Sequence, residues 1–227
     1  MAAQGVKYNV DIVMCIDCTG SMGDLLDTVK TNALKFYPDL KARCDAKGKE
    51  ISELRIRVIG FRDFYADEAN AIEDSGFYNI PDQETDFKNF VNGLVPGGGG
   101  DEPENGLEAL AMAINSDWTT GGDKKRHVVV VWSDASTHPL GLAKCKNEYY
   151  PKNMPKDFDE LTNWWNDEQG EKMNKKAARL IVFAPDASAW TEMGIHWDNV
   201  IHHPAKAGAG LEEVDYDTIL ASIAESV

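Results

Sequence analysis

The amino-acid sequence predicts an α/β protein in which helices cover both faces of a doubly wound, mainly parallel sheet. Apolar, strand-like runs alternate with amphipathic helical stretches along the chain, which is the order of parallel strands joined by crossover helices. The runs at 127–133 and 178–184 are apolar almost throughout, as expected for strands buried on both faces. No repeat, low-complexity stretch or linker interrupts the pattern, so we expect residues 1–227 to form a single domain.

Strands are expected wherever β-branched and apolar residues dominate a short stretch. The run at 8–16 is mostly apolar, whereas the run at 54–64 alternates between apolar and polar residues. The run at 76–80 is short, and we expect it at an edge of the sheet. The complete set of predicted strands is 8–16, 54–64, 76–80, 127–133, 178–184 and 199–202.

Helices are expected where apolar side chains recur every three to four residues. The longest is at 22–46, and Pro38 inside it is expected to kink or split it. The helix at 104–115 has Pro103 where a first-turn proline belongs. A glycine-rich loop at 96–100 precedes it. The complete set of predicted helices is 22–46, 85–94, 104–115, 157–167, 188–195 and 216–226.

The composition indicates a sizeable core and a strongly acidic surface. Hydrophobic residues make up 43% of the chain, and 38 acidic against 23 basic residues give a net charge of −15. That charge repels phosphate backbones and anionic membrane surfaces, so neither nucleic acid nor membrane is an expected partner. No apolar run approaches the roughly 20 residues of a membrane span. The absence of a recognisable signal peptide and the few cysteines predict a cytoplasmic protein.

Cys15 and Cys18 have the spacing of a redox or zinc pair. Cys15, however, falls inside a predicted strand, and no second Cys or His pair completes a zinc site. We therefore interpret Cys15 as a buried core residue and Cys18 as incidental.

Acidic and hydroxyl residues follow the predicted strands. Asp17, Thr19 and Ser21 come directly after the first strand, at a spacing of two that places their oxygens on one side of a tight loop. Asp134 follows the apolar strand at 127–133. Ligands of open α/β sheets bind at the carboxyl ends of the strands. Carboxylate and hydroxyl oxygens suit a hard divalent cation there.

These segments resemble the von Willebrand factor A domain family, whose metal-ion-dependent adhesion site begins with a D-x-S-x-S or D-x-T-x-S motif. The segment 101–104 (DEPE) is similar to the D-x-P-E segment of β-integrin I-like domains, and 134–138 (DASTH) to their D-A-x-T-H segment. The glycine-rich stretch before Asp101 resembles the factor A domains attached to alpha-kinases. The resemblance covers most of residues 8–204 in element order and implies a Rossmann-like fold.

The resemblance also implies a ligand set for a magnesium ion, with calcium or manganese as alternatives. The implied ligands, direct or through water, are Asp17, Thr19, Ser21, Glu104 and Asp134. Asp101, together with Asp63, is implied for a second, neighbouring cation. Many factor A domains use a threonine in place of the glutamate at the position of Glu104.

Each of these residues also has a structural interpretation. Thr19 or Ser21 could cap a helix, but capping leaves Asp17 at the end of an apolar strand unexplained. Asp134 could be a turn residue, and Asp101 and Glu104 could supply favourable charge at a helix start. His138 is interpreted as holding its loop by hydrogen bonds, and His202 and His203 as structural.

We expect a non-enzymatic, metal-dependent protein-interaction module, in which a partner supplies an Asp or Glu to an open coordination position. Either Trp164 or Trp165 is expected to be exposed near the metal and to contact the partner. One alternative is a metal-dependent phosphoesterase of the haloacid dehalogenase type, although Thr19 stands where that class has its second aspartate. The other is a structural scaffold in which the metal only rigidifies the loops.

Overall fold

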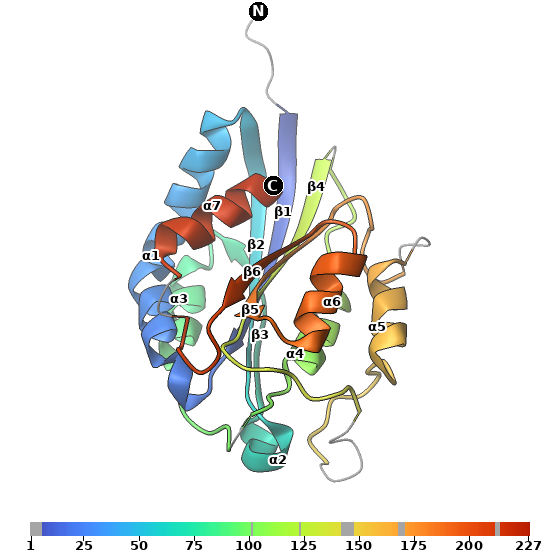
Figure 1. Ribbon diagram of the computed structural model, residues 1–227. Helices are drawn as coiled ribbons and strands as arrows, with labels where there is room; N and C mark the ends of the chain where they lie inside the picture. Colours follow the sequence, from blue (N-terminus) through green and yellow to red (C-terminus); the bar gives the residue numbers. More distant parts are fainter. Residues whose placement is uncertain (1–5, 101, 123, 142–147, 168–170, 212–213) are drawn as a thin grey trace, which may run out of the picture.

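A computed structural model of the protein describes residues 6–100, 102–122, 124–141, 148–167, 171–211 and 214–227. One six-stranded sheet in the order β3-β2-β1-β4-β5-β6 forms the centre of the fold (Figure 1). All neighbouring strands are parallel except the edge strand β3, which runs antiparallel to β2. The strands are β1 (Val6–Asp17), β2 (Lys49–Phe61), β3 (Ile72–Ile80), β4 (Lys124–Trp132), β5 (Ala178–Pro185) and β6 (Val200–Ala205).

Helices cover both faces of the sheet (Figure 1). Helices α1, α3 and α7 lie on one face, and α4, α5 and α6 on the other. The predicted doubly wound α/β fold is therefore confirmed. The helices are α1 (Gly23–Ala46), α2 (Phe64–Asp67), α3 (Glu84–Gly93), α4 (Gly106–Ile114), α5 (Phe158–Trp165), α6 (Ser188–His196) and α7 (Tyr216–Ser226), with short 3-10 turns at Gly20–Met22 and Glu68–Asn70.

The central strands are buried because alternate side chains enter two separate cores. On β1, Ile12 and Met14 face the α1 and α7 layer, whereas Val13 and Cys15 face the α4 layer. The same alternation along β4 and β5 explains why these runs are apolar almost throughout. Cys15 is buried as predicted, and Cys18 is also part of the core rather than incidental.

Three details of the sequence prediction differ from the structure. Strand β2 ends at Phe61 rather than at residue 64, because the Asp63 carboxylate accepts the Tyr65 N–H (2.9 Å) and caps a new helical turn. Pro38 lies within α1 and does not split it. Helix α4 begins at Gly106, so Pro103 is not its first-turn residue.

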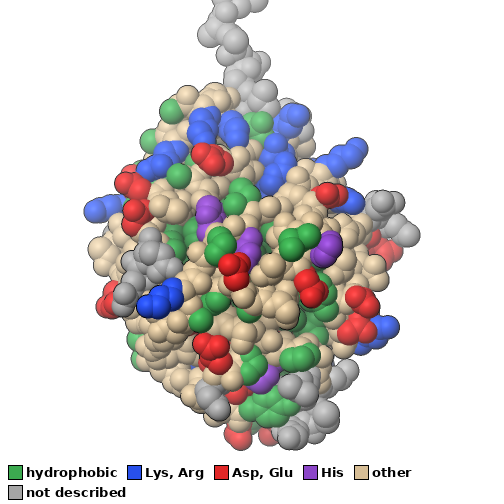
Figure 2. Space-filling view, viewed as in Figure 1, with side chains coloured by type: hydrophobic (Ala, Val, Ile, Leu, Met, Phe, Trp, Pro, Cys, Tyr) green, Lys and Arg blue, Asp and Glu red, His purple; other side chains and the backbone are tan. Residues whose placement is uncertain are grey.

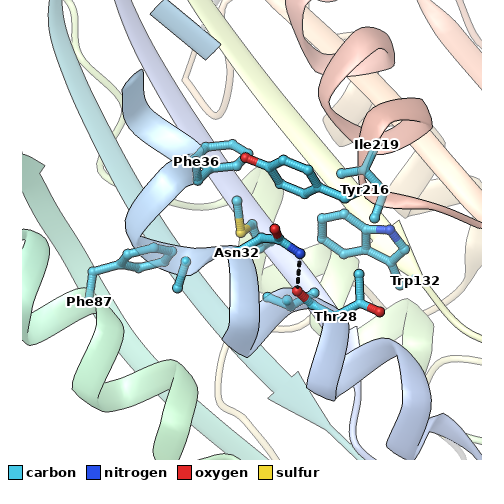
Figure 3. A pocket seen from close by; sticks show the side chains of 10 residues that line it. Thr28, Asn32, Phe36, Phe87, Trp132, Tyr216 and Ile219 are labelled. Carbon is cyan, nitrogen blue, oxygen red and sulfur yellow. Dashed lines mark hydrogen bonds between the residues drawn. The ribbon is translucent and has the colours of Figure 1, made fainter. Parts of the chain in front are cut away.

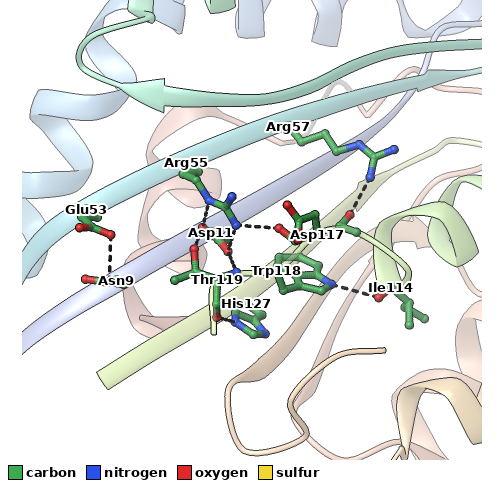
Figure 4. A network of polar contacts seen from close by, with 11 residues as sticks. Asn9, Asp11, Glu53, Arg55, Arg57, Ile114, Asp117, Trp118, Thr119 and His127 are labelled. Carbon is green, nitrogen blue, oxygen red and sulfur yellow. Dashed lines mark hydrogen bonds and ion pairs between the residues drawn. The ribbon is translucent and has the colours of Figure 1, made fainter. Parts of the chain in front are cut away.

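An ion pair joins β1 and β2 near the middle of the two strands, and the segment before β4 binds to the same carboxylate (Figure 4). The Asp11 carboxylate, 1% exposed, accepts two hydrogen bonds of 2.8 Å from the Arg55 guanidinium. Thr119 donates its N–H (2.6 Å) to the same carboxylate, and the His127 ring contacts the Thr119 carbonyl (2.9 Å). A buried carboxylate with this many donors anchors the α4–β4 connection to the sheet.

The face of the sheet under α1 and α7 contains a small apolar cavity of about 20 Å³ (Figure 3). Phe36 from α1, Trp132 from β4, and Tyr216 and Ile219 from α7 point toward one another around it. The cavity is not part of the candidate site, because none of the residues that line it also lines the cleft over Thr19, Ser21, Glu104 and Asp134.

Among the described residues, no helix is both long enough and apolar enough to cross a membrane.

Candidate metal centre

The carboxyl ends of β1 and β4 bring Asp17 and Asp134 to the same edge of the sheet. The two strands are parallel neighbours, with Ile16 of β1 paired with Trp132 of β4. Asp17 is the last residue of β1, and Asp134 lies two residues beyond β4. Both carboxylates are almost completely buried, with 0% and 1% of the residue exposed.

The Asp17 carboxylate is held by hydroxyl and backbone donors. Its Oδ1 accepts the Thr19 hydroxyl (2.7 Å) and the Thr19 N–H (2.9 Å), and its Oδ2 accepts the Ser133 hydroxyl (2.8 Å). Burial raises the pKa of Asp17 to about 6, despite the lowering effect of these hydrogen bonds. A carboxylate in this setting gains from a neighbouring positive charge.

The Asp134 carboxylate is held in the same manner from other segments. Ser21 donates its hydroxyl to Oδ1 (3.0 Å), and the Gly210 N–H donates to Oδ2 (2.7 Å). The Gly208 N–H donates to the Asp134 backbone carbonyl (2.8 Å). The segment before α7 therefore closes one side of the site.

Glu104 is brought to the site by a backbone bridge rather than by a helix start. Its N–H donates to the Ser136 carbonyl (3.0 Å), and its carbonyl accepts the His138 N–H (2.8 Å). This bridge to the segment after β4 uses the backbone N–H and carbonyl of Glu104, which would otherwise belong to the first turn of a helix. The Leu107 N–H, in the first turn of α4, donates to the Thr137 hydroxyl (3.2 Å).

The Glu104 carboxylate is buried next to other acidic groups, and one of its oxygens lacks a hydrogen-bond partner among the described residues. Its Oε2 is buried and has no hydrogen-bond partner, and the residue is 5% exposed. Burial, followed by the charges of Asp17, Asp63, Asp67 and Asp134, raises the pKa of Glu104 to about 9. Burial and mutual repulsion of carboxylates both favour a bound cation or proton.

A cleft of about 310 Å³ opens over these groups. Gly99 approaches so closely that an added Cβ would lie 2.8 Å from Glu104 Oε1 and 2.8 Å from Thr19 Cγ2, and its φ of +80° also favours glycine. The glycine-rich loop thus forms a wall of the cleft that no side chain could occupy. The cleft is lined by Thr19, Gly20, Ser21, Gly98, Gly99, Gly100, Glu102, Glu104, Asp134, Ala135 and Gly208.

The oxygen atoms of the cleft suit a cation only if hydroxyl groups contribute. In the part of the chain that the structure describes, no group of three or more His, Cys, Asp or Glu side chains converges to hold a metal. Thr19 and Ser21 each give their single hydroxyl hydrogen to a carboxylate, however, which leaves the oxygen lone pairs available to a cation. Together with the unpartnered Glu104 oxygen, this donor set fits a hard divalent ion.

A second cation site near Asp101 cannot be placed, because Asp101 lies outside the described residues. Asp63, its expected companion, is 5% exposed and has structural roles: it caps α2, and its Oδ1 lies 3.4 Å from His138 Nε2. Asp67, which the sequence did not single out, accepts the Gly99 N–H (2.9 Å) and holds the glycine-rich loop in place.

Two other residues that hold the loops of the site in place, Arg62 and Ser133, were not predicted from the sequence. Arg62, 6% exposed, donates to the backbone carbonyls of Val95 (2.7 Å) and Gly97 (2.9 Å) and pairs with Glu73 (2.8 Å). Ser133 could have been found, because it directly precedes Asp134 at a strand end. Arg62 gave no such signal, because its partners come from a distant loop.

A buried Glu108 ties a surface loop to α4. Its Oε1 accepts the Tyr150 hydroxyl (2.7 Å), and its Oε2 accepts the Asn105 side-chain amide (3.1 Å). The Tyr150 oxygen in turn accepts the Gly141 N–H (2.9 Å). Burial raises the pKa of Glu108 above its usual range. These contacts hold the residues after β4 next to the start of α4.

Tyr150→Phe is expected to destabilise the protein by about 1–2 kcal/mol, because it leaves the Gly141 N–H and a Glu108 oxygen without their partner. Chemical denaturation measures the loss. Tyr149→Phe, at an exposed neighbouring tyrosine, is the matched control. Equal stability of Tyr150→Phe and wild type would contradict the role of this contact.

The prediction that Trp164 or Trp165 is exposed near the metal and contacts a partner was wrong. Trp165 is 2% exposed and stacks on Trp197. Trp164 is only partly buried, but Lys172 Nζ lies 4.3 Å from its ring and also donates to Asn115 (2.9 Å). Asn115 caps the carboxyl end of α4, whereas the site lies at the amino end of that helix.

The histidines act structurally, as interpreted from the sequence. His202 Nε2 contacts the Ala184 carbonyl (2.9 Å), and His203 stacks on Phe183 and contacts Ser222. His138 lies beside Asp63 and the Tyr65 ring, where it supports the loop.

The chain is similar in structure to a von Willebrand factor domain and to a pilus adhesin. The vWF domain of the type V pili tip protein Mfa5 from Porphyromonas gingivalis superimposes with a TM-score of 0.51 at 14% identity, over 97% of this chain and 96% of that chain. The pilus adhesin SpaC from Lactobacillus rhamnosus GG gives a TM-score of 0.56 at 10% identity, over 98% of this chain and 31% of that chain. The protein therefore has a von Willebrand factor A-like fold.

Sequence similarity is distant. The alpha-protein kinase vwkA of Dictyostelium discoideum is 25% identical over 129 residues, which are 57% of this chain. The chain spans about a fifth of that relative, since the match covers 19% of its length. No protein-family model matches the sequence.

Proposed function

We propose that the protein is a metal-dependent interaction module that binds a magnesium ion at the carboxyl edge of its sheet and an acidic side chain of a partner protein through that ion. The observation that carries the proposal is the orientation of Thr19 and Ser21. Both hydroxyls donate to buried carboxylates and present their lone pairs to the cleft. The von Willebrand factor A-like fold of the pilus adhesin neighbours is consistent with an adhesive role.

The residues that would hold the ion are Thr19 and Ser21 through their hydroxyls and Asp17, Glu104 and Asp134 directly or through water. When bound, magnesium supplies positive charge and one exchangeable position for a further oxygen ligand. Asp17, Glu104 and Asp134 are buried, so apart from the exposed Glu102 the open side of the cleft is lined mainly by glycine and hydroxyl groups. An incoming carboxylate meets little steric hindrance there. Calcium and manganese are proposed as alternatives to magnesium. Asp101 is proposed as a ligand of a second, neighbouring cation.

The same arrangement favours binding over phosphoester hydrolysis. Hydrolysis of the haloacid dehalogenase type needs a second carboxylate two residues after the first to act as general acid. Here that position is Thr19, whose hydroxyl hydrogen is already donated to Asp17. We therefore propose a non-enzymatic role, with the metal-dependent phosphoesterase and the rigid scaffold as alternatives to be tested.

The test is a calorimetric titration with magnesium and with manganese, followed by capture of partner proteins on the immobilised chain with and without EDTA. We expect magnesium to bind, EDTA to release the partner, and Thr19→Ala to weaken partner binding more than it lowers the melting temperature, because it removes one hydrogen bond to Asp17 and leaves the sheet core intact. Thr28→Ala, at a partly buried threonine of α1, is the control. Partner binding that survives both EDTA and Thr19→Ala would favour the scaffold. Metal-dependent hydrolysis of p-nitrophenyl phosphate, lost in Asp17→Asn, would favour the phosphoesterase.

A further inference from the structure

A group of cations lies at the end of the sheet opposite the candidate metal centre. Figure 2 shows Lys and Arg side chains gathered at the upper end of the molecule, where β1, β2 and β4 begin, although the whole chain carries a net charge of −15. Lys49, Arg126 and Arg179 are among the first three residues of β2, β4 and β5, and therefore lie at the amino ends of these strands.

Register places these three residues on one face of the sheet. Arg126 has the same parity along β4 as Val128 and Val130, which pack under α1 and α7. Arg179 has the parity of Ile181 on the neighbouring strand, and Arg179 pairs with Val128. Lys49 likewise has the parity of Ile51. Arg126 and Arg179 therefore leave the neighbouring strands β4 and β5 on the side where α1 and α7 end, and Lys49 leaves β2 on the same side, with β1 between β2 and β4.

These cations lack acidic partners although acidic residues are abundant. Within the described residues, Lys49, Arg126 and Arg179 form no ion pair with a carboxylate. The nearby acids are already engaged: Glu50 pairs with Lys7 (4.0 Å), and Glu225 pairs with Lys47 (3.7 Å).

Among the described residues, the two arginines contact backbone oxygens and a ring. Arg126 donates to the Lys125 carbonyl (2.9 Å) and lies over the Tyr8 ring (5.3 Å), while its Nε is buried without a partner. Arg179 donates to the carbonyls of Ala178 (2.6 Å) and Lys176 (3.3 Å). Burial and the adjacent Arg126 charge lower the pKa of Arg179.

The carboxyl ends of α1 and α7 offset part of this charge but not all of it. Lys49 Nζ lies 3.5 Å from the Glu225 carbonyl at the end of α7, a favourable position for a cation near a helix carboxyl end. Even so, burial lowers the pKa of Lys49; Cys44 partly offsets this, and the charges of Lys47, Arg126 and Arg179 each lower the pKa by a smaller amount. Mutual repulsion between cations persists in the folded protein.

We propose that Arg126, Arg179 and Lys49 form a binding site for a phosphate-type oxyanion, separate from the metal centre. A doubly charged tetrahedral anion matches a site with several cations and no internal carboxylate, and arginine forks bind phosphate oxygens in pairs. A single carboxylate would neutralise less of the positive charge. Among the described residues, no acidic side chain of the protein pairs with these three cations. The ligand is a small phosphate or phosphomonoester rather than a membrane surface, because the rest of the molecule repels anionic lipid.

The test compares melting temperatures in sodium phosphate and in sodium chloride of equal ionic strength, with EDTA present so that the metal centre is empty of cations. We expect phosphate to stabilise the wild type, and calorimetry to show that Arg126→Gln and Arg179→Gln each weaken phosphate binding by about tenfold or more. Lys35→Gln, at an exposed lysine of α1, and Asp17→Asn are expected to bind phosphate as the wild type does.

Stability in chloride separates loss of the site from loss of the fold. Removing one of several mutually repelling cations should leave the melting temperature in chloride unchanged or higher. Should either glutamine variant unfold, Arg179→Lys keeps the charge but loses the paired donors, and we expect it to bind phosphate at reduced affinity. The proposal fails if phosphate adds no stability beyond that of chloride or if the arginine variants bind phosphate normally. Binding to phosphatidylglycerol vesicles without binding to free phosphate would also overturn it.

Discussion

Asp17→Asn is expected to reduce magnesium affinity by about 100-fold, the upper end of the roughly 10–100-fold that loss of a supporting carboxylate costs. The substitution removes the negative charge beneath Thr19 but preserves the shape of the side chain. It also keeps an oxygen that can accept the Thr19 or Ser133 hydroxyl, so the fold should survive. Calorimetry with magnesium and with manganese measures the change.

The matched control is Asp27→Asn, at an exposed aspartate on α1, which should bind magnesium normally. Melting temperatures in EDTA report whether the metal-free fold is intact. Because Asp17 is buried and its pKa is raised to about 6, neutralising it should cost the metal-free protein little stability. Wild-type magnesium affinity in a folded Asp17→Asn variant would exclude the proposed metal centre.

Stability of the metal-free protein is expected to fall as the pH rises from about 5.5 to about 8.5, which is opposite to the behaviour of paired surface carboxylates. The pKa of Glu104 is raised to about 9 in the folded protein, from an ordinary value of 4.5. Over this range the unfolded chain has released the proton that folded Glu104 retains, so a rise in pH favours unfolding. The contribution of Asp17 has the same sign but ends near pH 6.

Magnesium should counteract this loss, because it replaces the proton as the neutralising charge and gains affinity as the proton leaves. Thermal melts at several pH values, in EDTA and in magnesium, measure both effects. Glu104→Gln should flatten the pH dependence in EDTA and weaken magnesium binding, whereas Glu192→Gln, at an exposed glutamate of α6, should do neither. A metal-free protein that becomes more stable between about pH 5.5 and about pH 8.5 would contradict this account.

Local patterns in the sequence were sufficient to predict the architecture. Apolar runs of strand length and amphipathic stretches predicted all six strands and every helix except the short α2 and the 3-10 turns. The D-x-T-x-S spacing and the position of Asp134 after an apolar strand predicted where the site would form. Both inferences rest on the periodicity of side chains along one element, which sequence records directly.

Tertiary contacts decided how the site is built. The sequence indicated a helix start at Glu104, but the bridge to residues 136–138 places Glu104 in extended backbone at the edge of the cleft. Tryptophan is a residue type common in protein interfaces, yet Trp164 packs against Lys172 near the carboxyl end of α4, away from the site. Neither outcome follows from local pattern, because each depends on which distant segment supplies the hydrogen-bond or packing partner.

The sequence by itself therefore determined the sheet, the alternation of its two cores and the identity of the residues at the end of β1. Only the tertiary structure decided that Ser133 and Gly210 hold the two aspartates, that Gly99 closes against Thr19 and Glu104, and that a Glu104 oxygen is left without a partner. The physical reason is that propensity and periodicity act between neighbours in the chain. Desolvation and the pairing of buried charges depend on groups that folding brings together from distant parts of it.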